Sequence, residues 1–220
     1  MAFIAIEQNL SSVKELIYLP PQEIEQLFEI AQNGATSSLG SLRDFLGINA
    51  DIHLNCLSFL PIPILIDRIK LYYQDSVGFH LRFSGDISGE IYTFFRQQDM
   101  VYLIERMLGQ KRKPGKSFNR MEISVLTELV HIISNSFWRA MAEKTSLNWW
   151  FTPPTMVSDL SRSMAYSAKV YNLDSLLIHF EFIIPVSDIR FQYIILPGHN
   201  TIQKILEKLS PAAATAEIED

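Results

Sequence analysis

The feature that most constrains the fold is a polar stripe that occurs twice, on two stretches whose apolar residues recur at helical spacing. The first stretch follows two prolines at positions 20 and 21, and the second starts at position 119. Each carries four polar residues at positions i, i+4, i+7 and i+11, which share one face of an α-helix. The first set is Glu25, Glu29, Gln32 and Thr36, and the second set, 99 residues later at every position, is Ser124, Glu128, His131 and Asn135. A repeat of this kind predicts two halves with similar structures.

The second stretch is otherwise strongly apolar. Its apolar positions are Val125, Leu126, Leu129, Val130, Ile132, Ile133, Phe137 and Trp138. The solvent face of an ordinary amphipathic helix would hold more charge than this narrow stripe supplies. For either helix alone a plain solvated face stays open as an interpretation, but the repetition of the stripe favours a binding surface.

Around the first stripe the residues predict a long helix, a strand, a segment that fits either a helix or a strand, a β-hairpin and a second helix. These elements occupy residues 22–47, 51–59, 62–70, 76–96 and 99–108. Pro21 suits the first turn of the long helix, and Gly47 suits its end. Gly85 and Asp86 supply the turn of the hairpin. The first half therefore spans about residues 20–110.

The second half, about residues 118–209, restarts with the other long helix. A short strand follows, then two strands that pair around Leu173 and Asp174, a last strand and a final helix. These elements occupy residues 120–144, 147–151, 164–172, 175–184, 189–196 and 202–209. We expect one domain over residues 20–209, an N-terminal extension over residues 1–19 and a disordered tail over residues 210–220, which is small and acidic.

Composition and charge exclude several classes of protein. Of the 220 residues, 48% are apolar and 20% are charged, as in soluble globular chains. A formal net charge of −5 disfavours nucleic acid as a partner. No apolar run approaches the roughly 20 residues of a membrane span, and the N-terminus lacks the basic start of a signal peptide. The single Cys56 cannot form an internal disulfide, and no Cys or His spacing predicts a metal site, so we expect a reducing, cytoplasmic location.

The second half contains Ser124, Glu128, His131 and Pro154 in a fixed spacing: a serine, a glutamate four residues on, a histidine three residues later and a proline after a further 22 residues. This pattern resembles the signature of the CheC/CheX/FliY family of chemotaxis phosphatases, in which Asn stands at the position of His131. Three of the four signature positions therefore agree, and the match includes the polar stripe.

The first half resembles the first copy of the same signature. Glu29 and Gly34 match it, and Gln32 replaces its Asn. The proline that follows this helix in the family would fall at Asn55, whereas the chain has Pro61. Taken in order, the matching segments cover most of the chain from about residue 20 to residue 196.

The resemblance implies an α/β (α+β) fold with pseudo-two-fold symmetry, a largely antiparallel central sheet and the two long repeat-related helices on one face. It also implies a role in bacterial chemotaxis or two-component signalling, in which the protein binds a phosphorylated CheY-like receiver domain and hydrolyses its aspartyl phosphate. The regulator brings its own Mg²⁺, so no cofactor and no metal ligand is expected on this chain. In the family the Asn amide orients the attacking water, and the nearby Glu docks on the active-site Lys of the regulator.

Transferred to this chain, the resemblance assigns two pairs of catalytic candidates, Glu128 with His131 and, second, Glu29 with Gln32. The remaining stripe residues are expected to bind the partner: Ser124, Asn135, Glu25 and Thr36. A neutral imidazole can donate through one ring nitrogen and accept through the other, so His131 can orient a water. Because its geometry differs from that of an amide, loss of turnover is an equal expectation.

Several alternatives stay open. The chain could be a non-catalytic response-regulator-binding or scaffold module with degenerate phosphatase sites. His131 could be a satisfied half-buried histidine, Asn135 could supply the amide instead, and Pro154 could merely end a strand. A CheD-type protein and a second copy of the chain, in a homodimer, are further partners that the sequence leaves open. The tryptophans are expected in the core or in dimer contacts: Trp138, Trp149 and Trp150. An unrelated hydrolase is disfavoured, because no nucleophile elbow or phosphate-binding glycine loop is present.

Overall fold

In the computed structural model, which describes residues 19–47, 53–73, 76–112, 117–170, 176–184 and 188–210, two helices of equal length carry the polar stripes. They are α2 (Pro21–Leu46) and α5 (Arg120–Thr145), each of 26 residues. Helix α2 begins at a proline and ends at Gly47, which has a left-handed φ of 58°. Helix α5 begins with a capping box, in which the side chain of Asn119 accepts from the backbone of Glu122 and the Glu122 carboxylate accepts from the Asn119 N–H. Both predicted long helices are confirmed.

Small residues hold α2 and α5 side by side. A Cβ added to Gly34 would lie 2.6 Å from ring atoms of Phe137, so only glycine allows this approach. The Ser38 hydroxyl donates to the Ile133 carbonyl over 2.9 Å, across the helix pair. These contacts use the inward faces of the two helices and leave the stripes on the other side.

Within the described residues the sheet has seven strands, and every pairing among them is antiparallel. The strands are β1 (His53–Pro61), β2 (Ser76–Gly85), β3 (Gly89–Arg96), β4 (Trp149–Phe151), β5 (Thr155–Val157), β6 (Leu176–Ile184) and β7 (Ile189–Pro197). Their order is β1-β6-β7-β3-β2-β4, and β5 also pairs with β2. Strand β1 of the first half therefore pairs in the second half, and β4 and β5 of the second half pair in the first. Because the halves exchange their outer strands, they form one sheet and one unit.

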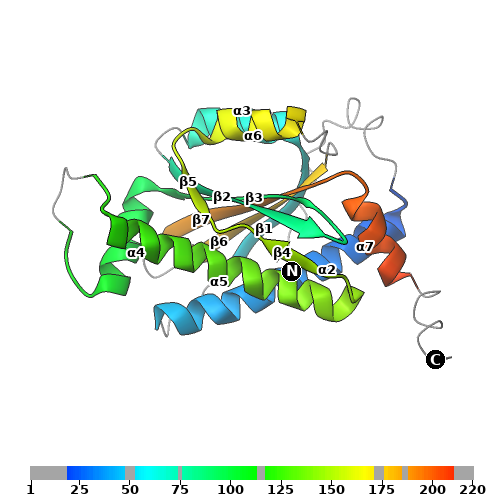
Figure 1. Ribbon diagram of the computed structural model, residues 1–220, viewed down its shortest axis with the longest axis horizontal. Helices are drawn as coiled ribbons and strands as arrows, with labels where there is room; N and C mark the ends of the chain where they lie inside the picture. Colours follow the sequence, from blue (N-terminus) through cyan, green and yellow to red (C-terminus); the bar gives the residue numbers. More distant parts are fainter. Residues whose placement is uncertain are drawn as a thin grey trace.

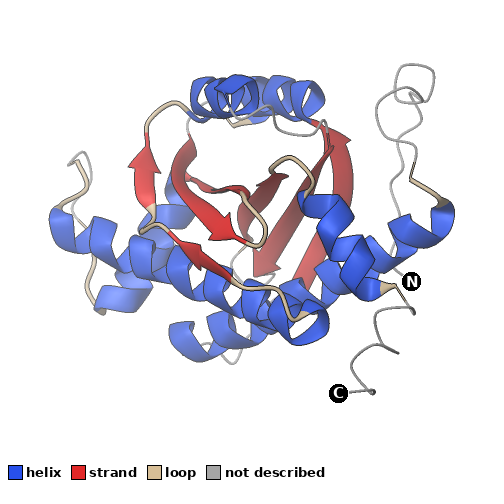
Figure 2. Cartoon of the chain, turned by 45° about the vertical axis from the view of Figure 1, so that its right-hand side comes forward, coloured by secondary structure: helices blue, strands red, loops and turns tan. Residues whose placement is uncertain are grey.

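Helices cover both faces of this sheet, as Figures 1 and 2 show. Helices α3 (Ile62–Tyr72) and α6 (Leu160–Val170) lie on one face, over a core that contains Tyr92, Phe94 and Ile194. The other face packs against α2, α5, α4 (Gln97–Leu108) and α7 (Thr201–Leu209), around Phe137 and Trp138. The order α2-β1-α3-β2-β3-α4 of the first half is repeated in the second half as α5-β4-β5-α6-β6-β7-α7, in which the two short strands β4 and β5 take the place of β1. The expected pseudo-two-fold fold, with its largely antiparallel sheet and its two long helices on one face, is confirmed.

One predicted element is wrong. Residues 164–172 were expected to form a strand paired with residues 175–184, but residues 160–170 form α6, and β6 pairs with β1 and β7 instead. The alternation of polar and apolar residues in this stretch imitates a strand, whereas the buried residues Leu160, Met164 and Ser167 follow helical spacing. The Asp159 carboxylate, which accepts from the backbone N–H of Arg162 over 2.9 Å, marks the start of this helix.

Other expectations meet the structure as follows. The ambiguous segment 62–70 is helical, within α3, and β5 is a strand that the sequence did not predict. The residues of the predicted extension before Leu19, the predicted tail after Ser210 and the side chain of Cys56 lie outside the part of the chain that the structure describes. Among the described helices, none combines the length and the apolarity that crossing a membrane requires.

Candidate functional site

The stripe of α5 faces solvent. Ser124, Glu128 and Asn135 are exposed, and His131 is half-buried. The opposite face of the helix fixes this orientation, because Leu126, Leu129, Val130 and Ile133 are fully buried against the sheet and α2. Glu128 and His131, one helical turn apart, therefore point from the same side of a rigid element.

The stripe of α2 faces solvent as well. Glu25, Glu29, Gln32 and Thr36 are all exposed, and the Thr36 hydroxyl donates to the Gln32 carbonyl over 2.9 Å. The structure thus brings the residues of each predicted set together on one helix. It keeps the two sets on two different helices, which meet through their small inward-facing residues.

A buried hydrogen bond sets the rotation of α5 at the level of His131 and Asn135. The Tyr193 hydroxyl, on β7, donates to the Ser134 hydroxyl over 3.1 Å, and both side chains are fully buried. Burial raises the pKa of Tyr193 well above its ordinary value, so the phenol stays protonated and remains a donor. Sequence reasoning missed this pair, because a tyrosine in a strand and a serine in an apolar helix carry no local signal that they meet.

A hollow opens beside the stripe of α5, between the C-terminal half of that helix and β4. Its volume is about 410 Å³. Its lining residues are His131, Asn135, Trp138, Arg139, Ala142, Leu147, Asn148, Trp149, Trp150 and Phe151. Two of the predicted stripe residues therefore border a concave surface, and sequence reasoning had not connected Arg139, Asn148 or Trp150 with them.

The three tryptophans have different environments. Trp138 is buried in the core, in contact with the rings of Phe83 and Trp149, as expected. Trp149 is half-buried, and Trp150 is 66% exposed. Of the two expected environments, the core position is wrong for Trp150, because it lies on the short edge strand β4 with its side chain exposed, and a dimer contact stays a prediction. Pro154, the last residue of the family signature, is buried in the connection between β4 and β5, immediately before β5.

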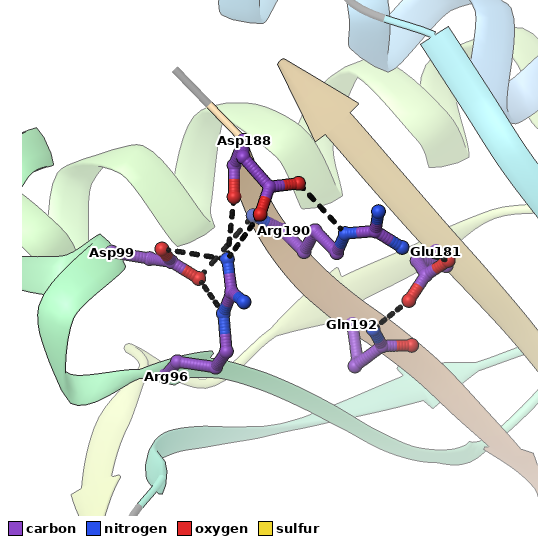
Figure 3. A network of polar contacts seen from close by, with 6 residues as sticks. All are labelled: Arg96, Asp99, Glu181, Asp188, Arg190 and Gln192. Atoms are coloured by element: carbon purple, nitrogen blue, oxygen red, sulfur yellow. Dashed lines mark hydrogen bonds and ion pairs between the residues drawn. The ribbon is translucent and has the colours of Figure 1, made fainter. Parts of the chain in front are cut away.

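A polar network elsewhere in the molecule has a structural role. Figure 3 shows Arg96 beside Asp99 and Asp188, and Arg190 beside Asp188 and Glu181. The guanidinium of Arg96 donates to Asp99 over 3.0 Å and to the Asp188 carbonyl, and Arg190 donates to Asp188 over 3.2 Å. Because acids and bases compensate one another here, the network ties the start of α4 to the start of β7.

The described residues form no evident metal-binding site. Within them no group of three or more His, Cys, Asp or Glu side chains is arranged to hold a metal ion. The stripe residues of α5 supply instead a carboxylate, an imidazole, a hydroxyl and an amide, which can accept and donate hydrogen bonds to a docked surface.

Known proteins resemble this chain in their fold and not in their sequence. No protein-family model and no curated protein matches the sequence. The chain is similar to FliY from Thermotoga maritima, with 14% identity and a TM-score of 0.67 over 88% of this chain and 98% of that one. It is similar to the CheX–CheY–BeF3–Mg²⁺ complex from Borrelia burgdorferi, with 13% identity and a TM-score of 0.53 over 76% of this chain and 97% of that one. It is also similar to the FliM middle domain from H. pylori, with 12% identity and a TM-score of 0.59 over 86% and 99%.

These relatives define the class of the fold. FliY, CheX and FliM middle domains share the CheC-like fold, and this chain has it as well. The resemblance found in the sequence motifs is thus confirmed at the level of the fold. The roles of the stripe residues stay predictions, because identities this low establish architecture alone.

Proposed function

We propose that this protein binds the phosphorylated receiver domain of a CheY-like response regulator through the stripe of α5 and accelerates hydrolysis of its aspartyl phosphate. The observation that carries the proposal is the exposure of Glu128 and the accessibility of His131 on one face of a rigid helix, with the spacing of the family's Glu and Asn. The similarity to the CheX–CheY–BeF3–Mg²⁺ complex supports a receiver domain as the partner.

In this mechanism the chain supplies positioning. The Glu128 carboxylate docks on the active-site Lys of the receiver through a charge-assisted hydrogen bond. The His131 imidazole accepts a hydrogen bond from a water molecule and holds it in line with the phosphorus atom. The water oxygen forms the new bond to phosphorus, the bond to the aspartyl oxygen breaks, and inorganic phosphate and the free aspartate result. Mg²⁺ arrives bound to the receiver, where it neutralises the phosphoryl charge.

The pair on α2, Glu29 and Gln32, is the second candidate site. Gln32 carries an amide, the group that the family uses, on a side chain one methylene longer than Asn. Holding that longer side chain in one rotamer costs more conformational entropy, so we assign the main activity to α5.

The test is the decay of phosphorylated receiver domains with and without this protein, at several pH values around the ordinary histidine pKa of about 6.5. The variants His131→Ala and His131→Asn accompany the wild type. Faster decay that His131→Ala abolishes and His131→Asn preserves is the expected result. If neither the wild type nor any variant accelerates the decay, the phosphatase proposal is wrong.

A second candidate function is a non-catalytic binding module. Two observations favour it: His131 and Gln32 replace the family's Asn in both copies, and a FliM middle domain with this fold occurs in a FliG–FliM complex from H. pylori. A stable complex with a receiver domain that leaves the phosphate lifetime unchanged would identify this function. Gain of phosphatase activity in His131→Asn would add that the docking surface is retained and the catalytic group lost. Pull-down with a CheD-type protein and sedimentation of the protein alone test the two remaining partners.

A further inference from the structure

The hollow beside α5 continues the stripe toward the C-terminal end of the helix. His131 and Asn135 form one end of its lining, and Arg139, one turn beyond Asn135, extends it along the same helix. On the other side stand Asn148 and Trp150, at the start of the edge strand β4, which Figure 1 shows beside α5. A partner that covers His131 therefore also meets this concave surface.

The described lining of the hollow carries a cation and no acid. None of the ten described lining residues is an acid, and the amide of Asn135 and the guanidinium of Arg139 can donate hydrogen bonds to a partner. The Asn148 amide already donates to the Asp86 carboxylate over 3.5 Å. Arg139 is exposed, and within the described chain it has no ion-pair partner. The exposed ring of Trp150 adds a flat apolar surface next to this cation, and aromatic residues and arginine are the types enriched at binding hot spots.

The rim of the hollow is held in place before any partner arrives. The Asn148 N–H donates to the Asp86 carboxylate over 2.8 Å, and the Asp86 N–H donates back to the Asn148 carbonyl over 2.9 Å. Trp150 pairs with Ser84 of β2, and the neighbouring Trp149 ring packs 5.1 Å from that of Trp138. A surface that is already rigid loses little entropy on binding.

We infer that this hollow is a second contact region for the same receiver domain, and that it takes an acidic segment beside the phosphorylated aspartate. The inference rests on the proposed function. Carboxylates hold the Mg²⁺ that accompanies an aspartyl phosphate, so the rim around the phosphoryl group is acidic, and Arg139 with its uncharged donors complements it. Arg139 and Trp150 then determine which receiver binds, while Glu128 and His131 act on the phosphoryl group.

The first half has no cation at the equivalent position, and its next cation along the stripe, Arg43, does not line the hollow. The position 99 residues before Arg139 is Gly40, an exposed helical glycine with no atom within 4 Å of where its Cβ would stand. The inference therefore assigns receiver selection to the α5 side of the molecule.

The experiment measures binding of Mg²⁺-loaded, beryllofluoride-treated receiver domains by titration calorimetry, at two salt concentrations. The variants are Arg139→Glu, Arg139→Lys, Trp150→Ala and Trp150→Phe. Matched controls are Arg162→Glu, a charge reversal on α6 at the opposite face of the sheet, and Tyr166→Ala, an exposed aromatic on the same helix. Acrylamide quenching of tryptophan fluorescence, with Trp150→Phe as the reference, reports whether the exposed ring becomes covered in the complex.

We expect Arg139→Glu and Trp150→Ala each to weaken binding about tenfold or more, and the conservative Arg139→Lys and Trp150→Phe to stay within about threefold of the wild type. The two controls stay within about twofold, and Trp150 loses its accessibility to acrylamide in the complex. If the wild type binds and Arg139→Glu and Trp150→Ala bind with the same affinity, this inference is wrong and the proposed function stands. Failure of the wild type to bind any receiver overturns both.

Discussion

Helices α2 and α5 have the same length and the same stripe, yet their surroundings differ. The start of α5 has a capping box, and its stripe leads into a hollow with an arginine and an exposed tryptophan. At the start of α2 no side chain makes a capping hydrogen bond, and glycine stands at the position of Arg139. The repeat has kept the framework that presents the stripe in both halves, because the sheet and the helix pair need both copies. The surface around the stripe is free to diverge: the stripe of α5 leads to Arg139 beside the hollow, whereas the exposed cation of α2, Arg43, lies one turn further along its helix.

The largest expected effect separates the two carboxylates. Glu128→Ala should weaken binding of the activated receiver by roughly 2 kcal/mol, about thirtyfold, because it removes a charge-assisted contact. Glu29→Ala, the equivalent change on α2, should leave the affinity within about twofold. Titration calorimetry of both variants with the same receiver checks this. Equal losses of affinity in the two variants would show that the stripes of α2 and α5 contribute equally to binding.

Substitutions at two glycines of α2 should affect stability in opposite directions, because one glycine is on the buried side of the helix and the other on its exposed side. Gly34→Ala should destabilise the protein by about 1–3 kcal/mol, because the new Cβ would overlap the Phe137 ring and push α2 and α5 apart. Gly40→Ala should stabilise it by about 1 kcal/mol, since alanine favours a helix and the site is open. Urea unfolding measures both. A stabilised Gly34→Ala variant would contradict the close helix contact.

The helix starts provide a third contrast. Asn119→Ala should cost about 1 kcal/mol of unfolding free energy, because the backbone N–H groups of Met121 and Glu122 lose their acceptor. Pro20→Ala, at the start of α2, removes no capping hydrogen bond and should change stability by less than about 0.5 kcal/mol. Thermal unfolding of the two variants, monitored by circular dichroism, tests the difference. A larger loss in Pro20→Ala would mean that α2 depends on its start more than α5 does.

The smallest expected effect is on the pH dependence of stability, to which two polar clusters contribute, one on strands β6–β7 and one on β2–β3. His179 contacts Gln192, and burial lowers its pKa, so the unfolded chain binds that proton more readily than the folded one. Stability should therefore fall as the pH drops below the ordinary histidine value of about 6.5, and His179→Gln should flatten this slope. His199→Gln, at an exposed site, serves as the control. Identical slopes for wild type and His179→Gln in thermal unfolding between pH 7.5 and pH 5.5, chosen to bracket that value, would contradict the assignment.

The corresponding cluster of β2–β3 titrates in a lower pH range. Burial acts to raise the pKa of Glu90, but hydrogen bonds from His80, Ser167 and Tyr92 outweigh it and lower the pKa below its ordinary 4.5. Glu90 therefore contributes stability above that pH and loses it on further acidification, which separates its effect from that of His179.

The sequence by itself determined the two long helices, their solvent-facing stripes, the hairpin β2–β3 and the two-half organisation. These features depend on residues close together in the chain: a stripe at helical spacing, a turn at Gly85 and a motif repeated after 99 residues. The same repeat could have identified α6, because the corresponding segment of the first half was already compatible with a helix. The alternation in residues 164–172 competed with that signal, and packing of Leu160 and Met164 on the sheet decided for the helix.

Tertiary structure alone decided the exchange of outer strands, the hydrogen bond between Tyr193 and Ser134, and the hollow beside His131. The first two join residues far apart in the sequence, such as Tyr193 with Ser134. The hollow is lined by residues 131–151, which are near one another in the chain but form a concave surface because β4 pairs with β2. Local periodicity carries no information about which strand a segment will pair with, because edge and central positions are chosen by the burial that the whole sheet achieves. For that reason the stripe could be predicted from the sequence, while the concave surface beside it could not.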